Sequence, residues 1–243
     1  MKKKSKYIVV IPARLKSTRL PNKPLLKIKG KEMILRTYEQ CAKVINKTKI
    51  FVATDSKLIF DLCKRNSIQV LLTSSSCLTG TDRIAEVAKK IKANFYINVQ
   101  GDEPIFNPID LKKLIKFASL NSDQIINGYT KIETKKDFFN INIPKVALTK
   151  KNNLLYMSRA PIPFNKKKFF KLAYRQVCAY SFPRKVLLEI NKNNKKTKFE
   201  SIEDIEILRF LELGYNIKMI CMSNKSIAVD TKEDLKRVSR LIK

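Results

Sequence analysis

Two aspartates each follow a short apolar run, and this position favours a metal site. Asp102 lies in the turn after residues 96–99, and Asp230 directly follows residues 227–229. Each run predicts a buried strand, and open α/β sheets bind ligands at the carboxyl ends of their strands. Carboxylate oxygens suit Mg²⁺, so the two aspartates are candidate ligands of one metal ion. For Asp102, the plainer alternative is a turn in which it or Glu103 caps the next segment.

A strongly basic loop follows the first predicted strand. Residues 7–11 are apolar, and residues 12–24 carry four cations, two hydroxyl side chains and three prolines. In an α/β fold such a loop lies over the edge where nucleotides bind, so Arg14, Arg19 and Lys23 are candidates for binding triphosphate oxygens. Backbone N–H groups of the same loop would reach the base. The structural alternative is a solvated loop with ordinary hydroxyl turns.

The composition limits the chemistry further. The 243 residues include no histidine, which excludes Ser-His-Asp and Cys-His catalysis, imidazole bases and histidine-bound metals. Catalysis then depends on carboxylates, lysine, arginine, tyrosine or a metal held by oxygen, a set typical of phosphoryl and nucleotidyl transfer. Five widely spaced cysteines without a C-x-x-C pair predict reduced thiols rather than disulfides or a zinc site.

The net charge invites a nucleic-acid interpretation, which the distribution of the charge disfavours. The chain has 51 Lys and Arg against 21 Asp and Glu, a formal charge of +30, and such a balance suits nucleic acid. The lysines are spread through every segment and form no basic stripe, so we expect an anionic small substrate and no nucleic-acid partner. No stretch has the length of a membrane span or the pattern of a signal peptide, so we expect a cytoplasmic protein without membrane insertion.

Apolar periodicity predicts an α/β domain with a mostly parallel sheet. In the first half of the chain, helical spacing alternates with short apolar runs, which is the βαβ pattern. The strands expected in this half lie at residues 7–11, 50–53, 68–72, 96–99 and 124–134, and the helices at residues 33–45, 58–63, 84–91 and 108–120. The second half predicts strands at residues 144–148, 154–158, 177–182, 217–222 and 227–229. It also predicts helices at residues 183–190, from a capping box at residues 201–204 through Leu213, and after Asp230.

Three groups of polar residues leave a structural and a functional interpretation open. Thr81 or Asp82 would cap the helix that follows, or their loop would contact a nucleobase or phosphate. Arg159 lies in a proline-rich extended segment, where a surface salt bridge is the plain expectation. Glu206 and Arg209 stand three residues apart on a predicted helix, so an ion pair between them is the structural alternative for both.

Six short motifs follow one another along the chain. They are VIPARLKSTRLPNKP at residues 10–24, VATD at 52–55, TGTDR at 79–83, NVQGDEP at 98–104, YMSRAPIP at 156–163 and VDT at 229–231. In order and spacing they resemble the 3-deoxy-manno-octulosonate cytidylyltransferases, the CMP-Kdo synthetases, over nearly the whole chain. The resemblance implies a Rossmann-like nucleotidyltransferase fold with helices on both faces of a mostly parallel sheet and a smaller β-rich region. It implies one domain over residues 1–243, made of a nucleotide-binding part (1–125), a sugar-acid and dimerisation excursion (126–225), and a metal-ligand strand end with a terminal helix (226–243).

The resemblance also implies an activity and a site. A homodimer would transfer CMP from CTP to the acidic eight-carbon sugar 3-deoxy-D-manno-octulosonate (Kdo) with Mg²⁺, releasing pyrophosphate and giving CMP-Kdo for lipopolysaccharide synthesis. The implied CTP-binding residues are Ala13, Arg14, Ser17, Lys23, Thr81, Asp82 and Arg83, the last three near the cytidine. The implied metal ligands are Asp102 and Asp230, which form the catalytic set together with Arg14 and Lys23. The residues implied to face the sugar acid are Gln100, Arg159, Gln176, Tyr180 and Glu206.

One position departs from the family pattern. Gln176 stands where the family usually has a histidine, and an amide donates a hydrogen bond but carries no charge. The sugar acid could therefore differ from Kdo, with an amino-Kdo or a nonulosonic acid as alternatives. A noncatalytic RNA-binding protein, driven by the net charge, is the alternative from another class.

Overall fold

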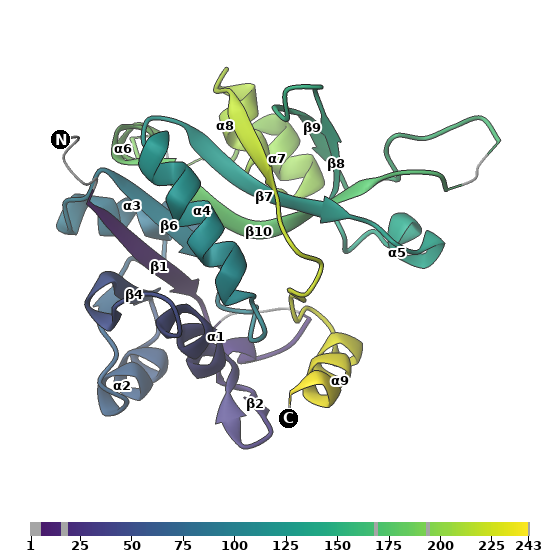
Figure 1. Cartoon of the computed structure of the whole chain (residues 1–243). Helices are drawn as coiled ribbons and strands as arrows, with labels where there is room; N and C mark the ends of the chain where they lie inside the picture. Colours follow the sequence, from purple (N-terminus) through teal and green to yellow (C-terminus); the bar gives the residue numbers. More distant parts are fainter. Residues whose placement is uncertain (1–5, 16–18, 168–169, 193–194, 243) are drawn as a thin grey trace.

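A mixed sheet forms the centre of the molecule (Figure 1). The computed structural model describes residues 6–15, 19–167, 170–192 and 195–242, and within these residues nine strands form one sheet. Its main path runs in the order β11 (Ile217–Cys221), β7 (Ile125–Lys131), β10 (Tyr174–Pro183), β6 (Phe95–Val99), β1 (Tyr7–Ala13), β4 (Ile50–Thr54) and β5 (Val70–Leu72). Neighbours on this path are parallel except where β10 runs antiparallel to β6 and β7. The predicted mostly parallel sheet is therefore confirmed.

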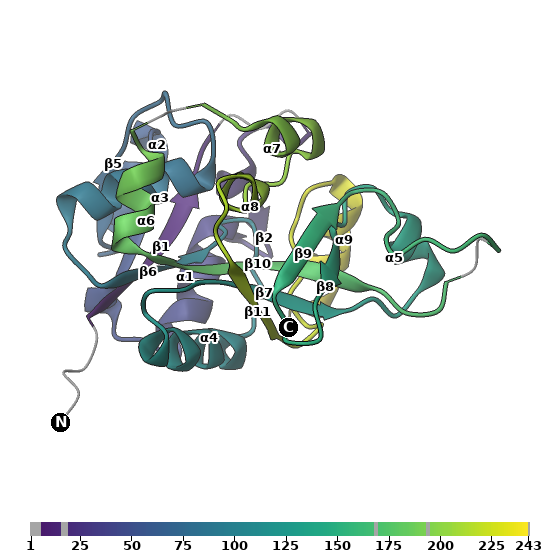
Figure 2. The ribbon, with the colours of Figure 1, turned by 90° about the horizontal axis from the view of Figure 1, so that it is seen from above.

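A hairpin extends the sheet to one side. Strands β8 (Lys145–Leu148) and β9 (Leu154–Ser158) pair with each other, as predicted, and β8 also pairs with β10. Figure 2 shows this hairpin and the short helix α5 (Lys135–Phe139) standing beside the main body. The remaining strands form a small ribbon, β2 (Lys27–Ile28) with β3 (Lys31–Glu32). Two 3₁₀ helices, η1 (Lys23–Leu25) and η2 (Lys47–Lys49), lie before β2 and β4.

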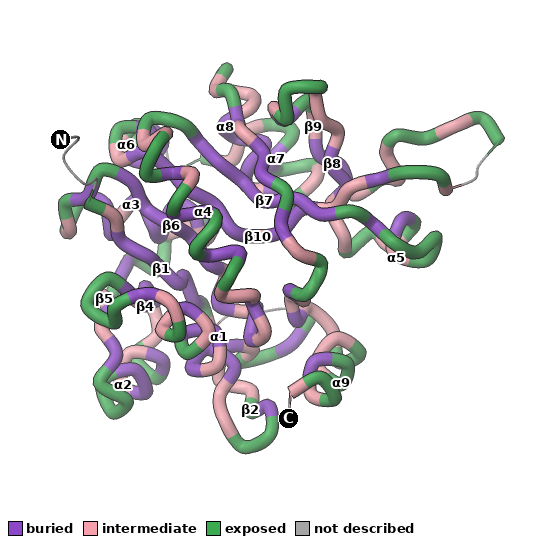
Figure 3. The backbone as a smooth tube through the Cα atoms, in the orientation of Figure 1, coloured by how far each residue is buried: buried purple, intermediate pink, exposed green. Residues whose placement is uncertain are grey.

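Helices cover both faces of the sheet because the central strands are apolar on both sides. Along β1, Val9 and Ile11 pack against α1 (Met33–Ala42), α2 (Lys57–Arg65) and α4 (Pro108–Leu120). Ile8 and Val10 pack on the opposite face against α3 (Gly80–Lys90), α6 (Arg184–Ile190) and α8 (Leu208–Glu212). Figure 2 shows α4 below the sheet and α6 and α8 above it, and Figure 3 shows the central strands as the buried part of the backbone. None of the described helices has the length and apolarity needed to cross a bilayer.

The structure corrects two predicted elements in the last third of the chain. Residues 227–229 form no strand; the Val229 N–H instead donates to the Asp102 carbonyl at 2.9 Å. The helix predicted from residue 201 to Leu213 is two helices, α7 (Lys198–Glu203) and α8. Thr197 and Glu200 form the capping box of α7, and Asp204 ends it with a left-handed backbone at φ +50°. The final helix, α9 (Lys232–Leu241), starts where it was predicted.

A third correction concerns the start of α3. The N-cap is Thr79, whose hydroxyl accepts from the Asp82 N–H while the Asp82 carboxylate accepts from the Thr79 N–H. Thr81 therefore lies inside the helix, and Asp82 is the third residue of the capping box rather than the cap. The shift leaves the hydroxyl and N–H of Thr81 free to bind a residue from elsewhere.

Candidate active site

Two carboxylates and one ammonium group meet at the carboxyl end of β6. The Lys23 Nζ atom lies 2.5 Å from Asp102 Oδ2 and 3.0 Å from Asp230 Oδ1. Arg19 joins the cluster with a guanidinium nitrogen 3.1 Å from Asp230 Oδ1. Asn22 adopts a left-handed backbone at φ +55°, and Pro24 follows Lys23 in η1, so the chain turns sharply at the lysine. The structure thus brings together the two aspartates that the sequence places at separate strand ends.

The charge of Lys23 is stabilised by its partners. Burial lowers the pKa of Lys23, but the negative charges of Asp102 and Asp230 outweigh burial, and the net pKa is raised. Lys23 is therefore a cation at neutral pH. Its ammonium shows that the space between the carboxylates accepts one positive charge. Among the described residues, no group of three or more histidine, cysteine or acidic side chains forms a larger metal cluster.

Glu103, next to Asp102, is a buried carboxyl group. Only 3% of the residue is exposed, and Oε2 has no hydrogen-bond partner among the described residues. Burial, reinforced by the charge of Asp102, raises the pKa of Glu103 from its ordinary 4.5 to about 8. Between pH 4.5 and about 8, the Glu103 carboxyl group is therefore protonated in the folded protein and ionised in the unfolded chain. It follows that Glu103 lowers stability as pH rises from 4.5 to about 8.

We expect Glu103→Gln to remove this pH dependence, because the amide resembles the protonated carboxyl group. At pH 8 the variant should have a free energy of unfolding about 4 kcal/mol above that of the unmodified chain, with little difference at pH 5. Urea unfolding at several pH values measures this change, with the exposed Glu233→Gln as control. A difference between Glu103→Gln and the unmodified chain that stays constant with pH would contradict the assignment.

Glu206 is bonded to the amino terminus of α3. Its carboxylate accepts from the Gly80 N–H at 3.1 Å, the Thr81 N–H at 2.9 Å and the Thr81 hydroxyl at 2.6 Å. Burial raises the pKa of Glu206, and the hydrogen bonds from Thr81 and Gly80 oppose that rise. These contacts hold the turn before α8 against the first turn of α3, which carries the third sequence motif.

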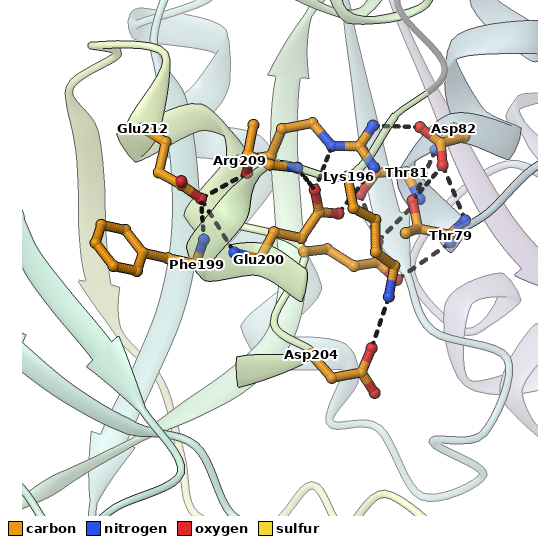
Figure 4. A network of polar contacts seen from close by, with 12 residues as sticks. Thr79, Thr81, Asp82, Lys196, Phe199, Glu200, Asp204, Arg209 and Glu212 are labelled. Carbon is orange, nitrogen blue, oxygen red and sulfur yellow. Dashed lines mark hydrogen bonds and ion pairs between the residues drawn. The ribbon is translucent and has the colours of Figure 1, made fainter. Parts of the chain in front are cut away.

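Arg209 makes a second bond between the same two parts of the chain (Figure 4). Its Nε and one terminal nitrogen lie 2.7 and 2.8 Å from the two oxygens of Glu200, and its other terminal nitrogen contacts Asp82. Only 2% of Arg209 is exposed. Burial lowers the pKa of Arg209, but the bonds to Glu200 and Asp82 outweigh burial and raise it. The ion pair expected between Glu206 and Arg209 is not formed, because each residue binds a different group of α3 or α7.

The residues implied near the cytidine lie at this junction, and two of them point into the protein. Asp82 is bonded to Thr79 and Arg209. The buried Arg83 guanidinium lies 2.5 Å from the Thr73 hydroxyl and 3.3 Å from Asp55 Oδ2. In the basic loop, Ala13 is buried and Arg14 is exposed, and Ser17 lies outside the described residues.

Among the residues implied to face the sugar acid, Gln176 bonds to groups within the protein. Its Nε2 atom donates to Asn127 Oδ1 at 3.1 Å and to the Tyr180 hydroxyl at 3.0 Å. All three residues are buried, and burial raises the pKa of Tyr180 well above its usual range. An amide with two N–H donors can donate to both groups at once, whereas a neutral imidazole, with one N–H, can donate to only one of them.

Arg159 is held by backbone carbonyls, and its salt bridge is long. The guanidinium donates to the carbonyls of Glu203, Ile141 and Asp204 at 2.6, 3.0 and 3.0 Å, and its nearest carboxylate oxygen, on Asp204, is 4.0 Å away. The Arg159 carbonyl accepts from the buried Lys145 ammonium at 2.6 Å. The expected surface salt bridge is therefore a minor part of a wider network.

Several residues of this site escape sequence interpretation. Glu200 had a signal, because Thr197 and Glu200 carry capping-box spacing that competes with the box expected at residues 201–204. Asn127 and Lys145 lie within strands and match no motif. Their roles depend on partners up to 52 residues away.

Comparison with known proteins gives the class of the chain. A family model described as Cytidylyltransferase matches residues 8–223. The fold is therefore that of a cytidylyltransferase. Its basic loop and two carboxylates lie at the carboxyl end of the central strands. The chain is 38% identical to the 3-deoxy-manno-octulosonate cytidylyltransferase of Chloroherpeton thalassium, with 98% of each covered. It is 37% identical to the protein of that name in Koribacter versatilis, covering 98% of this chain and 90% of the relative.

A solved structure gives the same assignment. A CMP:2-keto-3-deoxy-manno-octonic acid synthetase complexed with CTP superposes with a TM-score of 0.88 at 32% identity, covering 98% of each chain. The chain belongs to the 3-deoxy-manno-octulosonate cytidylyltransferase family.

Proposed function

We propose that this cytidylyltransferase moves CMP from CTP to the anomeric hydroxyl of Kdo and releases pyrophosphate. The observation that carries the proposal is the meeting of Asp102, Asp230 and Lys23 at the carboxyl end of β6, in a chain whose relatives are named for this reaction. Carboxylates and cations at such an edge suit a substrate with a metal-bound triphosphate. Because CTP is the donor, we expect the reaction in the cytoplasm, where CMP-Kdo would serve lipopolysaccharide synthesis.

The donor set fits Mg²⁺. Asp102 and Asp230 offer hard oxygen ligands that already enclose one cation, the Lys23 ammonium. When bound there, Mg²⁺ would neutralise negative charge on the triphosphate. Lys23 would then exchange its carboxylate contacts for phosphate oxygens, and the exposed Arg14 would bind the triphosphate from the other end of the loop. Two carboxylates leave further ligand positions for water and phosphate oxygens.

The proposed reaction needs positioning more than covalent chemistry. The anomeric oxygen of the sugar acid attacks the α-phosphorus, forming one P–O bond. The bond from that phosphorus to the bridging oxygen breaks, pyrophosphate leaves, and the hydroxyl proton passes to solvent. Lys23 and Arg14 would offset charge on the departing pyrophosphate. Arg159, with its guanidinium plane fixed by three carbonyls, would hold the sugar carboxylate.

The observed contacts of Gln176 support Kdo over another sugar acid. Gln176 bonds Asn127 and Tyr180 inside the protein, so its substitution for histidine changes an internal support. The relatives are named for Kdo as well. Nothing in the family assignment favours the RNA-binding alternative.

We also propose a homodimer through the β8–β9 excursion. Five large apolar side chains with 41% to 67% of their surface exposed lie in this excursion, in α5 or in the adjoining loops: Phe139, Ile141, Leu155, Phe164 and Leu172. Exposed apolar surface of this kind is typical of protein interfaces. Sedimentation at two salt concentrations tests the dimer, because an apolar interface should persist at high salt. A monomer at both concentrations would contradict it.

Pyrophosphate release with a panel of substrates tests the proposed function. The protein with Mg²⁺ and CTP is given Kdo, an amino-Kdo, a nonulosonic acid or no sugar, and UTP replaces CTP in a matched series. We expect release with CTP and Kdo, and none without sugar. Release only with a different sugar acid would keep the cytidylyltransferase and replace its acceptor.

Gly101 should be needed for this geometry. A Cβ there would lie 2.8 Å from the Pro12 carbonyl oxygen, so the backbone next to Asp102 must shift. We expect Gly101→Ala to cost about 2 kcal/mol of unfolding free energy and to lower turnover about tenfold or more. Gly214→Ala is the control, since Gly214 has φ +82° and open space around it; it should lose stability alone. Full turnover by Gly101→Ala would contradict the prediction.

A further inference from the structure

Two amide side chains stand side by side on β6 and its end without hydrogen-bond partners. Asn98 and Gln100 are two residues apart, so they project from the same face of the strand. Asn98 is 0% exposed, and neither its Nδ2 nor its Oδ1 atom has a partner among the described residues. Gln100 is partly exposed, and its amide likewise forms no hydrogen bond within the described part of the chain. The Gln100 amide lies beside α3, because a Cβ on Gly80 would be 3.3 Å from it.

The neighbouring strands carry polar side chains in the same row, and these are satisfied. Tyr180 of β10 stands directly opposite Asn98, and Asn127 of β7 stands opposite Tyr180. Asn127 donates to the carbonyls of Val177 and Ala179 at 3.0 and 2.9 Å and accepts from Gln176. In this row Asn127 on β7 and Tyr180 on β10 therefore have hydrogen-bond partners, whereas Asn98 on β6 has none among the described residues.

An unbonded buried amide is a costly feature. Leaving its donor and acceptor unpaired destabilises the folded protein, whereas an apolar side chain of similar shape would not. A ligand that bonds the amide removes this cost. An amide offers one acceptor and two donors, and a hydroxyl group offers one donor and two acceptor sites, so the two match.

We propose that Asn98 binds a hydroxyl group of the sugar acid, one farther from the anomeric carbon than the position of Gln100, which the family resemblance already assigns to the sugar side. The proposal rests on the proposed function. Gln100 lies on the Asp102 side of Asn98 in the sequence, and two residues of strand separate them by about 7 Å. Asn98 is therefore the deeper amide, farther from the cluster where the phosphorus would react.

The partly exposed Gln100 side chain gives a route to Asn98. It is the outward neighbour on the same face, and no described residue bonds its amide. A change of its side-chain rotamer would uncover the deeper amide without breaking a hydrogen bond. Gly80, which has no side chain, allows the Gln100 amide to lie close to α3 in its present position, since a Cβ there would be 3.3 Å from the amide.

The test compares Asn98→Leu with Asn127→Leu, which replaces a bonded amide that is also 0% exposed. Asn98→Leu should raise the unfolding midpoint of the ligand-free protein by about 2 to 4 °C. It should also raise the KM for Kdo about tenfold or more, with the KM for CTP unchanged. Asn127→Leu should lower the midpoint, because three hydrogen bonds are lost. Asn98→Ala removes the amide without adding bulk and should raise the KM for Kdo as well.

The outcomes separate this inference from the proposed function. An unchanged KM for Kdo in Asn98→Leu overturns the inference. An unchanged KM in Asn98→Ala also overturns it, because a rise seen only in Asn98→Leu would then come from the bulk of the leucine side chain. A lower midpoint in Asn98→Leu would mean that a buried water or protein group already satisfies the amide, and it would overturn the inference. If the unmodified chain turns over no sugar acid, the proposed function fails. Calorimetry of Kdo with CTP-loaded protein then decides whether Asn98→Leu weakens binding, and equal affinities overturn the inference.

Discussion

Asp102→Asn is expected to lower kcat by about a thousandfold while leaving the fold intact. The substitution removes one of the two charges that enclose a cation at the end of β6, and it weakens the bond that holds Lys23 in place. The Asp102 side chain is 26% exposed, so the amide can be hydrated and little stability should be lost. The Mg²⁺ concentration needed for half-maximal rate should rise in the variant.

Pyrophosphate release under saturating CTP and Kdo measures this effect. Asp61→Asn is the matched control, since Asp61 pairs with Lys57 at 2.8 Å within α2 and, in the described part of the chain, forms no hydrogen bond or ion pair with Lys23, Asp102 or Asp230. Its rate should equal that of the unmodified chain. A rate for Asp102→Asn within tenfold of the unmodified chain would remove Asp102 from the proposed catalytic set.

Arg209→Met should be among the most destabilising single substitutions in this chain. It leaves the buried carboxylates of Asp82 and Glu200 without their common partner, and breaking a buried pair in this way costs about 3 to 5 kcal/mol. The start of α3 should also loosen from α7 and α8. Because the Thr81 and Glu206 contacts lie beside this network, the loss should extend to the proposed nucleotide side.

Urea unfolding of Arg209→Met measures the loss, beside the exposed Arg65→Met on α2. The control should change by less than about 0.5 kcal/mol. Equal stabilities of the two variants would mean that solvent reaches the Arg209 network and that it does not hold the helices together.

The fold was predictable because its signals are local. Apolar residues on both faces of β1 and the helical spacing of α1 to α4 depend only on neighbours in sequence. The strand predicted at residues 227–229 was wrong because an apolar run resembles a strand whether or not a partner strand exists. In the structure the Val229 N–H donates to the Asp102 carbonyl instead. The break between α7 and α8 was missed because it depends on one left-handed residue, Asp204.

The site was predictable only in part. Asp102 and Asp230 were predicted as site residues from their position after apolar runs. The bonds from Lys23 to them span 79 and 207 residues, so no local sequence pattern could predict these contacts. The roles of Arg83 and Arg209 depend on burial and on partners from other elements. Family resemblance named candidate residues, and the contacts divide them into exposed groups such as Arg14 and internal supports such as Gln176.

The most direct test of the central claim is ³¹P nuclear magnetic resonance of the protein with CTP, Mg²⁺ and Kdo. We predict that the triphosphate signals of CTP decline while a phosphodiester signal and pyrophosphate grow in equal amounts, and that omitting Kdo leaves CTP intact. CTP that persists with Kdo present, or that yields free CMP without a phosphodiester, would contradict the account.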